Sequence, residues 1–167
     1  TPLSISYEYE PCDILKAREL VISRKRKYVK AEGEDFNSIV TGIMQQKGNI
    51  HMNIGTPLTS DEIAAAALCD KNDRYQLIRH AVDQRVIEGY KLWKNNYVAY
   101  DIVNHGFKYS HLYDQADVEQ FVSYMEHQLD TIEPEVNRED LRRIFLDIYV
   151  NPVYTKELLE KEKRTGN

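Results

Sequence analysis

The sequence lacks any long apolar run and carries little cysteine. Its longest uncharged stretch, Gly48 to Ser60, is interrupted by Pro57 and falls well short of the roughly 20 residues that a membrane-spanning helix needs. The two cysteines, Cys12 and Cys69, form neither a metal-spaced pair nor a disulfide framework, so a reducing cytosol is the expected compartment. No signal peptide is visible in this stretch, although a cut N-terminus would have removed one.

An excess of positive charge is also lacking. The 167 residues carry 27 acidic and 22 basic side chains, a net charge of −5, so nucleic acid is not expected as the main partner. Tyrosine is plentiful, with 12 Tyr against 4 Phe and 1 Trp, and it suits half-buried surfaces where its hydroxyl reaches a polar group. The length fits one domain with a sizeable core.

The chain opens on a strand pattern. Leu3, Ile5, Tyr7 and Tyr9 alternate with polar or small residues, which predicts a strand that buries this face, and Pro11 ends it. Because the sequence begins inside this strand, we expect a cut edge with the rest of a sheet upstream. A severed sheet exposes unpaired N–H and C=O groups, so self-association is expected.

A helix and a second strand are predicted next. The strand covers Ile50 to Ile54, where apolar residues alternate with His51 and Asn53. The helix before it, with Gly48 as its C-cap, carries one apolar stripe, formed by Phe36, Ile39, Val40, Ile43 and Met44. This succession favours a mostly parallel sheet. We therefore expect an α/β fold, in which residues 1–58 hold an incomplete small sheet of two or three strands.

Residues 59–167 predict a mostly α-helical region, which begins with a capping box of Thr59 and Glu62. Apolar stripes at helical spacing predict that its later helices form the core. The expected helices are a long one over 73–88, a shorter one through Tyr97, Tyr100 and Val103, one capped by Asp114, one beginning at Asn137, and a separate last one with Pro152 in its first turn.

Five stretches carry a resemblance to a known family. They are Thr-Pro-Leu-Ser-Ile at 1–5, Tyr-Glu-Tyr-Glu-Pro-Cys-Asp at 7–13, Gly-Asn-Ile-His-Met-Asn-Ile-Gly-Thr-Pro-Leu at 48–58, Tyr-Lys-Leu-Trp-Lys-Asn-Asn-Tyr-Val-Ala-Tyr-Asp at 90–101, and Tyr-Val-Asn-Pro-Val at 149–153. Together they resemble the C-terminal half of a bacterial branch of the glycerolipid acyltransferases, the superfamily of lysophosphatidate and glycerol-3-phosphate acyltransferases. The first stretch looks like the last sequence block of that family.

The resemblance implies a function for the parent protein. It would transfer an acyl group from a thioester donor, acyl-CoA or acyl carrier protein, to a hydroxyl of a glycerol phosphate or lysophospholipid, without a cofactor. Pro2, Leu3 and Ser4 would form part of the wall of the substrate pocket. Residues 1–58 would be the last strands and helices of the acyltransferase α/β domain, and residues 59–167 a helical C-terminal region.

The family's catalytic motif, a His followed five positions later by an Asp, is missing. The residues five positions after the five histidines are Thr56, Arg85, Ser110, Ala116 and Ile132. The family's Glu-Gly-Thr block is missing too, since Glu34 and Tyr90 follow the two Glu-Gly pairs. We therefore expect this stretch alone to be inactive, with an upstream catalytic half of the same protein as its first partner.

A basic cluster, Arg24, Lys25, Arg26 and Lys27, leaves two interpretations open. It could contact anionic lipid headgroups, which would place a cytoplasmic protein peripherally on the inner membrane. It could equally be a solvated helix end, the interpretation that we favour because charge runs are usually solvated.

Other candidate groups favour structural roles. Cys12 near a helix start has no base beside it in the sequence, so it is not expected to be a nucleophile. His80 with Asp83 predicts a surface pair. His105, His111 and Asp114 lack the spacing of a metal site, so none is predicted. The aromatic group formed by Tyr90, Trp93, Tyr97 and Tyr100 predicts packing between helices rather than an acyl-chain groove.

A second function class stays open. The chain could be a non-catalytic, helix-rich interaction or regulatory module whose similarity to acyltransferases is incidental. A self-contained module should protect its sheet edges, whereas a severed sheet should not.

Overall fold

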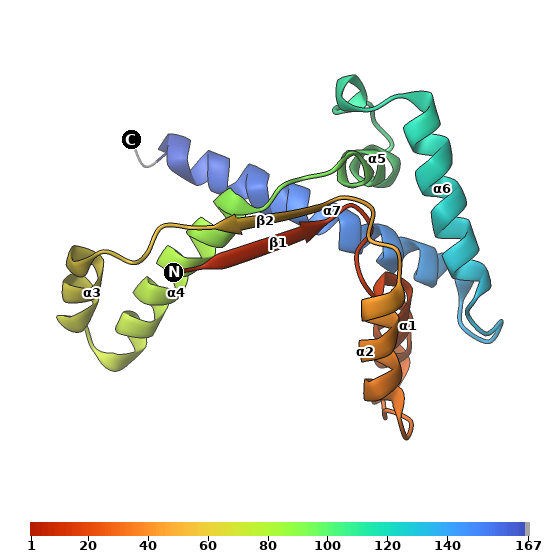
Figure 1. The fold of residues 1–167 in the computed structure, drawn as a ribbon, viewed down its shortest axis with the longest axis horizontal. Coiled ribbons are helices and arrows are strands. Elements are labelled where there is room, and N and C mark those ends of the chain that lie inside the picture. The colour runs from red at the N-terminus through yellow and green to blue at the C-terminus, as the bar shows by residue number, and fades with distance from the viewer. Residues whose placement is uncertain (166–167) are drawn as a thin grey trace. The chain divides into compact units, whose positions relative to one another are not determined.

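The computed structural model describes residues 1–165 and is mostly helical (Figure 1). The elements, in chain order, are β1 (Leu3–Tyr7), α1 (Asp13–Lys25), α2 (Glu34–Met44), β2 (Ile50–Ile54), α3 (Ser60–Ala67), α4 (Lys71–Gly89), α5 (Lys94–Val103), the short 3-10 helix η1 (Ser110–Leu112), α6 (Gln115–Asp130) and α7 (Arg138–Thr165). The expected small N-terminal sheet followed by a helical region is therefore confirmed.

The chain forms two compact units, each discontinuous in sequence. The first unit comprises Thr1–Ser6, Ile50–Lys91 and the chain from Thr155 onward. The second unit comprises Tyr7–Asn49 and Leu92–Tyr154. These bounds differ from the division at Thr59, and the assignment of residues 1–58 to an acyltransferase domain stays a prediction.

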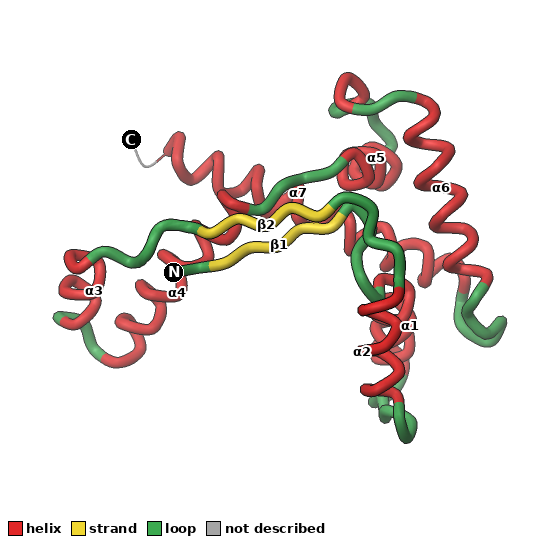
Figure 2. Tube along the Cα trace, viewed as in Figure 1, coloured by secondary structure: helices red, strands yellow, loops and turns green. Residues whose placement is uncertain are grey.

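The sheet has two strands, β1 and β2, which run antiparallel. The Gly55 amide donates to the Pro2 carbonyl at 3.0 Å at one end of the ladder, and the Glu8 amide donates to the Asn49 carbonyl at 2.9 Å at the other. The prediction of a mostly parallel sheet was wrong. Two helices, α1 and α2, connect the strands as a hairpin that brings the chain back (Figure 2), whereas a parallel neighbour needs a crossover.

The buried face of the sheet is the opposite of the one predicted from the sequence. Ser4 and Ser6 are 3% and 0% exposed, while Leu3 and Ile5 are 52% and 38% exposed. The reason is a close approach by the end of α4, because a Cβ built on Gly89 would lie 2.8 Å from the Ser4 Oγ. Only glycine on the helix and small side chains on the strand allow this contact.

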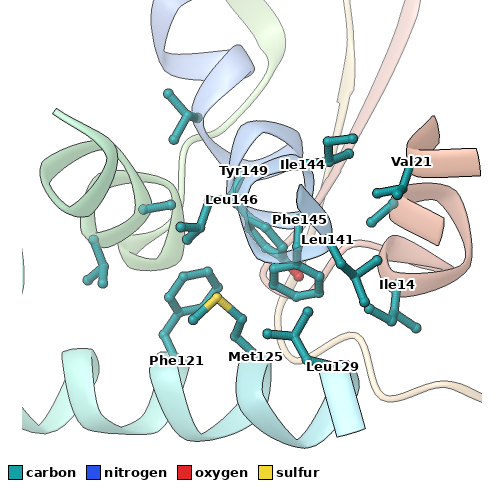
Figure 3. Close-up of a cluster of buried hydrophobic side chains, with 14 residues drawn as sticks. Ile14, Val21, Phe121, Met125, Leu129, Leu141, Ile144, Phe145, Leu146 and Tyr149 are labelled. Atoms are coloured by element: carbon teal, nitrogen blue, oxygen red, sulfur yellow. The ribbon is translucent and has the colours of Figure 1, made fainter. Parts of the chain in front are cut away.

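The second unit has the larger hydrophobic core, built by α1, α5, α6 and α7 (Figure 3). Phe121 of α6 meets Tyr149 of α7 edge-on at 5.0 Å between ring centroids, and Phe145 lies 5.4 Å from the same ring. Met125 and Leu129 continue the buried stripe of α6, so the predicted core stripe of this helix is confirmed.

The last two predicted helices are one helix. The predicted start holds, because the Asn137 Oδ1 accepts from the Asp140 amide at 2.8 Å. The predicted new start at Pro152 was wrong, since α7 runs through this residue to Thr165. Tyr149, Val150 and Val153 are 1%, 0% and 1% exposed, so packing on both sides of the proline offsets the backbone hydrogen bond that it cannot donate.

Candidate functional site

The predicted pocket-wall residues lie at the start of β1. Leu3 faces outward, Ser4 is buried, and the Pro2 carbonyl accepts a ladder hydrogen bond from Gly55. Among residues 1–165, the Ser4 Oγ is one of three buried side-chain oxygen or nitrogen atoms for which the structure shows no hydrogen-bond partner. The role of these three residues in a substrate pocket stays a prediction.

An uncovered apolar face lies on the sheet, and we call it the sheet face. The ladder register sets Leu3 opposite Ile54 and Ile5 opposite Met52. The exposed fractions are 52%, 72%, 38% and 60% in that order, and Ile50 adds 55%. Side chains on the inner face are polar instead, with Ser4 and Ser6 on β1 and His51 and Asn53 on β2. The usual arrangement of the sheet is therefore inverted, because its apolar side is the more exposed one.

Helix α2 repeats this inversion in the second unit. Its small and polar side packs on the start of α1, where the Cys12 Sγ lies 3.2 Å from the Ser38 carbonyl and a Cβ on Gly42 would lie 3.3 Å from that sulfur. The apolar stripe points away and is largely exposed, with Phe36 at 68%, Ile39 at 61%, Val40 at 40%, Ile43 at 69% and Met44 at 78%. We call these five residues the α2 stripe.

A buried carboxylate organises the second unit. Asp13 is 1% exposed and accepts hydrogen bonds from the hydroxyl groups of Tyr149 at 2.7 Å and Tyr124 at 2.8 Å, from the Gln45 Nε2 at 3.2 Å, and from the Ile14 amide at 2.7 Å. Burial raises the pKa of Asp13 although these four donors act against the rise. The Asp13 carboxylate also serves the start of α1 through its bond with the Ile14 amide, although the N-cap position belongs to Cys12.

Cys12 is a thiol rather than an activated thiolate. Its pKa is raised, first by burial and then by the charge of Asp13, while the charge of Lys47 acts in the opposite direction. The neighbouring oxygen is the Ser38 carbonyl, which accepts from the thiol and cannot serve as a base. This environment agrees with the structural role predicted for Cys12.

The basic cluster at the end of α1 is exposed, and acidic residues accompany it. Lys25 lies 3.9 Å from the Asp140 carboxylate, and Lys30 pairs with Asp35. Contact of Arg24, Lys25, Arg26 and Lys27 with anionic lipid stays a prediction. Among the described residues, no helix combines the length and apolar character needed to cross a bilayer.

The acidic members of the two remaining histidine groups make structural contacts. Asp83 lies 3.9 Å from Arg79 on the exposed side of α4. The Asp114 carboxylate caps α6 by accepting from the Asp117 amide at 3.0 Å. Within residues 1–165, no three His, Cys, Asp or Glu side chains are grouped so that they could hold a metal ion.

Two tyrosines of the aromatic group, Tyr97 and Tyr100, make ring contacts in the second unit. Tyr97 and Tyr100 of α5 lie 4.9 and 5.0 Å from the ring of Tyr109, and Tyr100 lies 5.3 Å from Tyr154 of α7. The predicted packing between helices is confirmed for Tyr100, whereas the ring contact of Tyr97 is with Tyr109, which precedes η1.

A cavity that the sequence did not predict lies in the second unit. It has a volume of about 600 Å³ and is formed by α5, the segment with η1 and the start of α6. Asp101, 4% exposed, lines it, and its Oδ2 accepts from the Tyr113 hydroxyl at 2.8 Å and the Tyr109 amide at 3.0 Å. Burial and the Asp101 carboxylate raise the pKa of Tyr113 to about 12. A clue in the sequence was an Asp on the otherwise apolar side of a helix followed by His105-Gly106.

Comparisons with family models, with curated proteins and with solved structures find no match to this chain.

Proposed function

We propose that this chain is the C-terminal part of a bacterial glycerolipid acyltransferase and that the catalytic half of the same protein packs against it. Two independent features support the proposal. The first is the resemblance of five stretches, from 1–5 to 149–153, to the C-terminal half of that family. The second is the uncovered sheet face of the first unit.

The sheet face carries the proposal because an isolated sheet of this kind is a poor folding solution. Two-stranded sheets are marginal in water, and an apolar face needs a second layer. Each large aliphatic side chain gains roughly 1.5 to 3 kcal/mol when it is fully buried. Leu3, Ile5, Ile50, Met52 and Ile54 are 38% to 72% exposed in the described chain, so a further layer would recover a substantial share of this energy.

The reaction would be acyl transfer from acyl-CoA or acyl carrier protein. The acceptor hydroxyl attacks the thioester carbonyl and gives its proton to a histidine base, and the departing thiolate then takes up a proton. The His and Asp would belong to the upstream half, and no cofactor is needed. This chain would supply β1, with Pro2, Leu3 and Ser4 in the pocket wall.

The decisive experiment uses the full-length protein. We expect it to transfer labelled acyl groups to lysophosphatidate or glycerol-3-phosphate, and we expect replacement of the upstream motif histidine by Ala to abolish the transfer. Activity that survives this replacement, or an upstream sequence without the His and Asp, would overturn the proposal.

A matched pair of variants tests the packing itself. Ile5→Asp places a charge on the sheet face and should lower both activity and thermal stability of the full-length protein. Leu68→Asp is the control, because Leu68 lies at the end of α3 and is 90% exposed. Equal behaviour of the two variants would argue against a covered sheet face.

A non-catalytic interaction module is the second candidate, and the α2 stripe favours it. A helix that turns its apolar side outward can bind the groove of a partner protein. A full-length protein that shows no acyl transfer but loses a co-purifying partner on Ile43→Asp would support this alternative.

We further propose a cytoplasmic location. A solvated helix end stays the favoured interpretation of Arg24, Lys25, Arg26 and Lys27, and the alternative is peripheral contact of these residues with the inner membrane. The exposed cations support it, since each contributes about 1 kcal/mol near an anionic surface. Charge reversal to Glu at all four positions should abolish co-sedimentation with anionic vesicles, and unchanged co-sedimentation would end the idea.

A further inference from the structure

We propose that the cavity formed by α5, the η1 segment and the start of α6 binds a small organic cation, an ammonium group on an apolar body, with Asp101 as its anionic anchor. This inference concerns the second unit alone and does not depend on acyl transfer.

One carboxylate oxygen of Asp101, Oδ1, is an acceptor without a donor in the described part of the chain. Its Oδ2 is engaged by Tyr113 and the Tyr109 amide, whereas its Oδ1 is buried and is one of three side-chain atoms within residues 1–165 for which the structure shows no hydrogen-bond partner. An unpaired buried carboxylate oxygen is costly, and this cost is removed by a donor, best of all a charged one. Asp101 lines the cavity, and in the proposed complex the ammonium group of the ligand donates to this oxygen.

The charge of the lining selects the ligand. Asp101 and Asp114 are both lining residues, and no Lys or Arg is among them. Lys108, which stands between the lining residues Phe107 and Ser110 in the sequence, lies over the rings of Tyr100 and Tyr109 at 5.2 and 5.0 Å from their centroids. The cavity therefore favours a cation and disfavours an anion of the same shape.

The remaining walls select an apolar body. Val98, Ile102 and Val118 provide aliphatic surface, and Phe107 provides an aromatic ring that can also attract a cation. The volume of about 600 Å³ lies in the range of small-molecule sites. Such a combination of an apolar cleft and a few polar groups is typical of ligand pockets.

The backbone is strained at the rim of the cavity. His105, a non-glycine residue, adopts a left-handed conformation with φ of 50°, and the Gly106 amide donates to the Asp101 carbonyl at 3.0 Å. Non-glycine residues in this region cost free energy and gather at binding sites.

Phenethylammonium is a suitable probe, and phenylacetate is its anionic control of similar size. Titration of the ¹⁵N-labelled protein should shift the amide signals of residues 98–118 with phenethylammonium and leave them unchanged with phenylacetate. The Asp101→Asn variant should bind the probe about tenfold more weakly or worse, the loss expected when a charged hydrogen bond is removed.

Two further variants distinguish a loss of binding from misfolding. Gln115→Arg, at an exposed lining position, should abolish binding because its guanidinium neutralises the two carboxylates. Asp61→Asn, at an exposed position on α3, should bind like the parent. Equal binding of phenylacetate, unchanged binding by Gln115→Arg and Asp101→Asn, or a crystal structure with only an ordered water at Oδ1 and no shift at millimolar probe, would each overturn the proposal.

Discussion

Asp13 shows how one buried charge can hold several elements of the second unit. Its partners come from α6 and α7 and from the residue that follows α2, and the Tyr149 hydroxyl also accepts from the Glu10 amide at 3.0 Å. The network is fully paired, which is the condition under which a buried polar group specifies one arrangement instead of destabilising it.

Removal of the Tyr149 hydroxyl should therefore destabilise the folded protein. We expect Tyr149→Phe to lower the free energy of unfolding by about 1 to 3 kcal/mol, because Asp13 loses a donor and the Glu10 amide loses its acceptor. Urea unfolding measures the change. Tyr154→Phe is the control, since its hydroxyl bonds Asn104 at an exposed site, and an equal loss in both variants would contradict a special role for the network.

Asp13 should also contribute to the pH dependence of the unfolding free energy. Its pKa is raised in the folded protein, so the folded state binds the proton more strongly than the unfolded state does. The stabilisation from this group is then complete below about pH 4 and is lost as the pH rises through the folded pKa. The unfolding free energy of the parent minus that of Asp13→Asn should fall with rising pH, by at most about 1.4 kcal/mol per pH unit.

Urea titrations from acid to neutral pH measure this difference, with Asp61→Asn on exposed α3 as the control. A difference that is flat or rises with pH would contradict a raised pKa for Asp13.

At the scale of residues, the sequence predicted hydrogen bonds between neighbours in the chain and missed those between residues far apart in it. The Thr59 and Glu62 capping box is confirmed, with the Thr59 amide donating to the Glu62 Oε2 at 2.7 Å. A cap is visible within four residues. The side-chain partners of Asp13 lie 32 to 136 positions away, and nothing in the local pattern predicts them. The free oxygen of Asp101 likewise depends on a fold that brings Tyr113 to its other oxygen.

At the scale of elements, α7 provides the sharpest contrast between local preference and packing. Pro152 lies inside the helix, where it cannot donate to the carbonyl four residues earlier. Pattern analysis alone favours a helix start there, because proline suits the first turn.

The two alternatives predict opposite effects of one substitution. If α7 is continuous, Pro152→Ala restores the hydrogen bond to the Ile148 carbonyl and should raise the free energy of unfolding by about 1 to 3 kcal/mol. At a helix start the same change would be neutral or destabilising. Calorimetry measures the outcome, and Pro134→Ala, in the exposed loop before α7, should bring no such gain.

The presence of most helices and strands could be predicted well from the sequence, whereas the burial of their faces could not. The apolar stripes of α2 and α6 look alike in sequence, yet Ile43 is 69% exposed and Phe121 is fully buried. Periodicity reports that a helix has an apolar side, not which partner covers it. The same limit applies to β1, where the small Ser4 and not Leu3 or Ile5 meets the glycine of α4. The antiparallel register depends on the α1 and α2 hairpin, which is also a tertiary feature.

For the whole molecule, the sheet face and the α2 stripe predict association. The chain of residues 1–167 should self-associate in a concentration-dependent way, since exposed apolar patches and unpaired strand edges favour contact between copies. Ile39→Lys with Ile43→Lys should reduce this association and change the unfolding free energy by no more than about 0.5 kcal/mol, because both positions are already exposed at 61% and 69%.

Sedimentation velocity over a range of concentrations measures the association. Ile144→Lys is the contrasting variant, because Ile144 is 3% exposed and its replacement should unfold the second unit. A parent chain that stays monomeric at high concentration would show that the two apolar surfaces do not drive association.

The interleaved order of the two units has a consequence for synthesis. The hydrogen bond between Asp13 and Tyr149 joins residues 136 positions apart, and the second unit takes its halves from both sides of residues 50–91. At a translation rate of roughly 5 to 20 residues per second, Asp13 leaves the ribosome on the order of ten seconds before its tyrosine is made. During that interval we expect α1 and α2 to lack the core that α6 and α7 supply, and we expect the Asp13 carboxylate to stay hydrated until α7 is made. Ribosome-associated chaperones would meet the α2 stripe well before the finished protein exists.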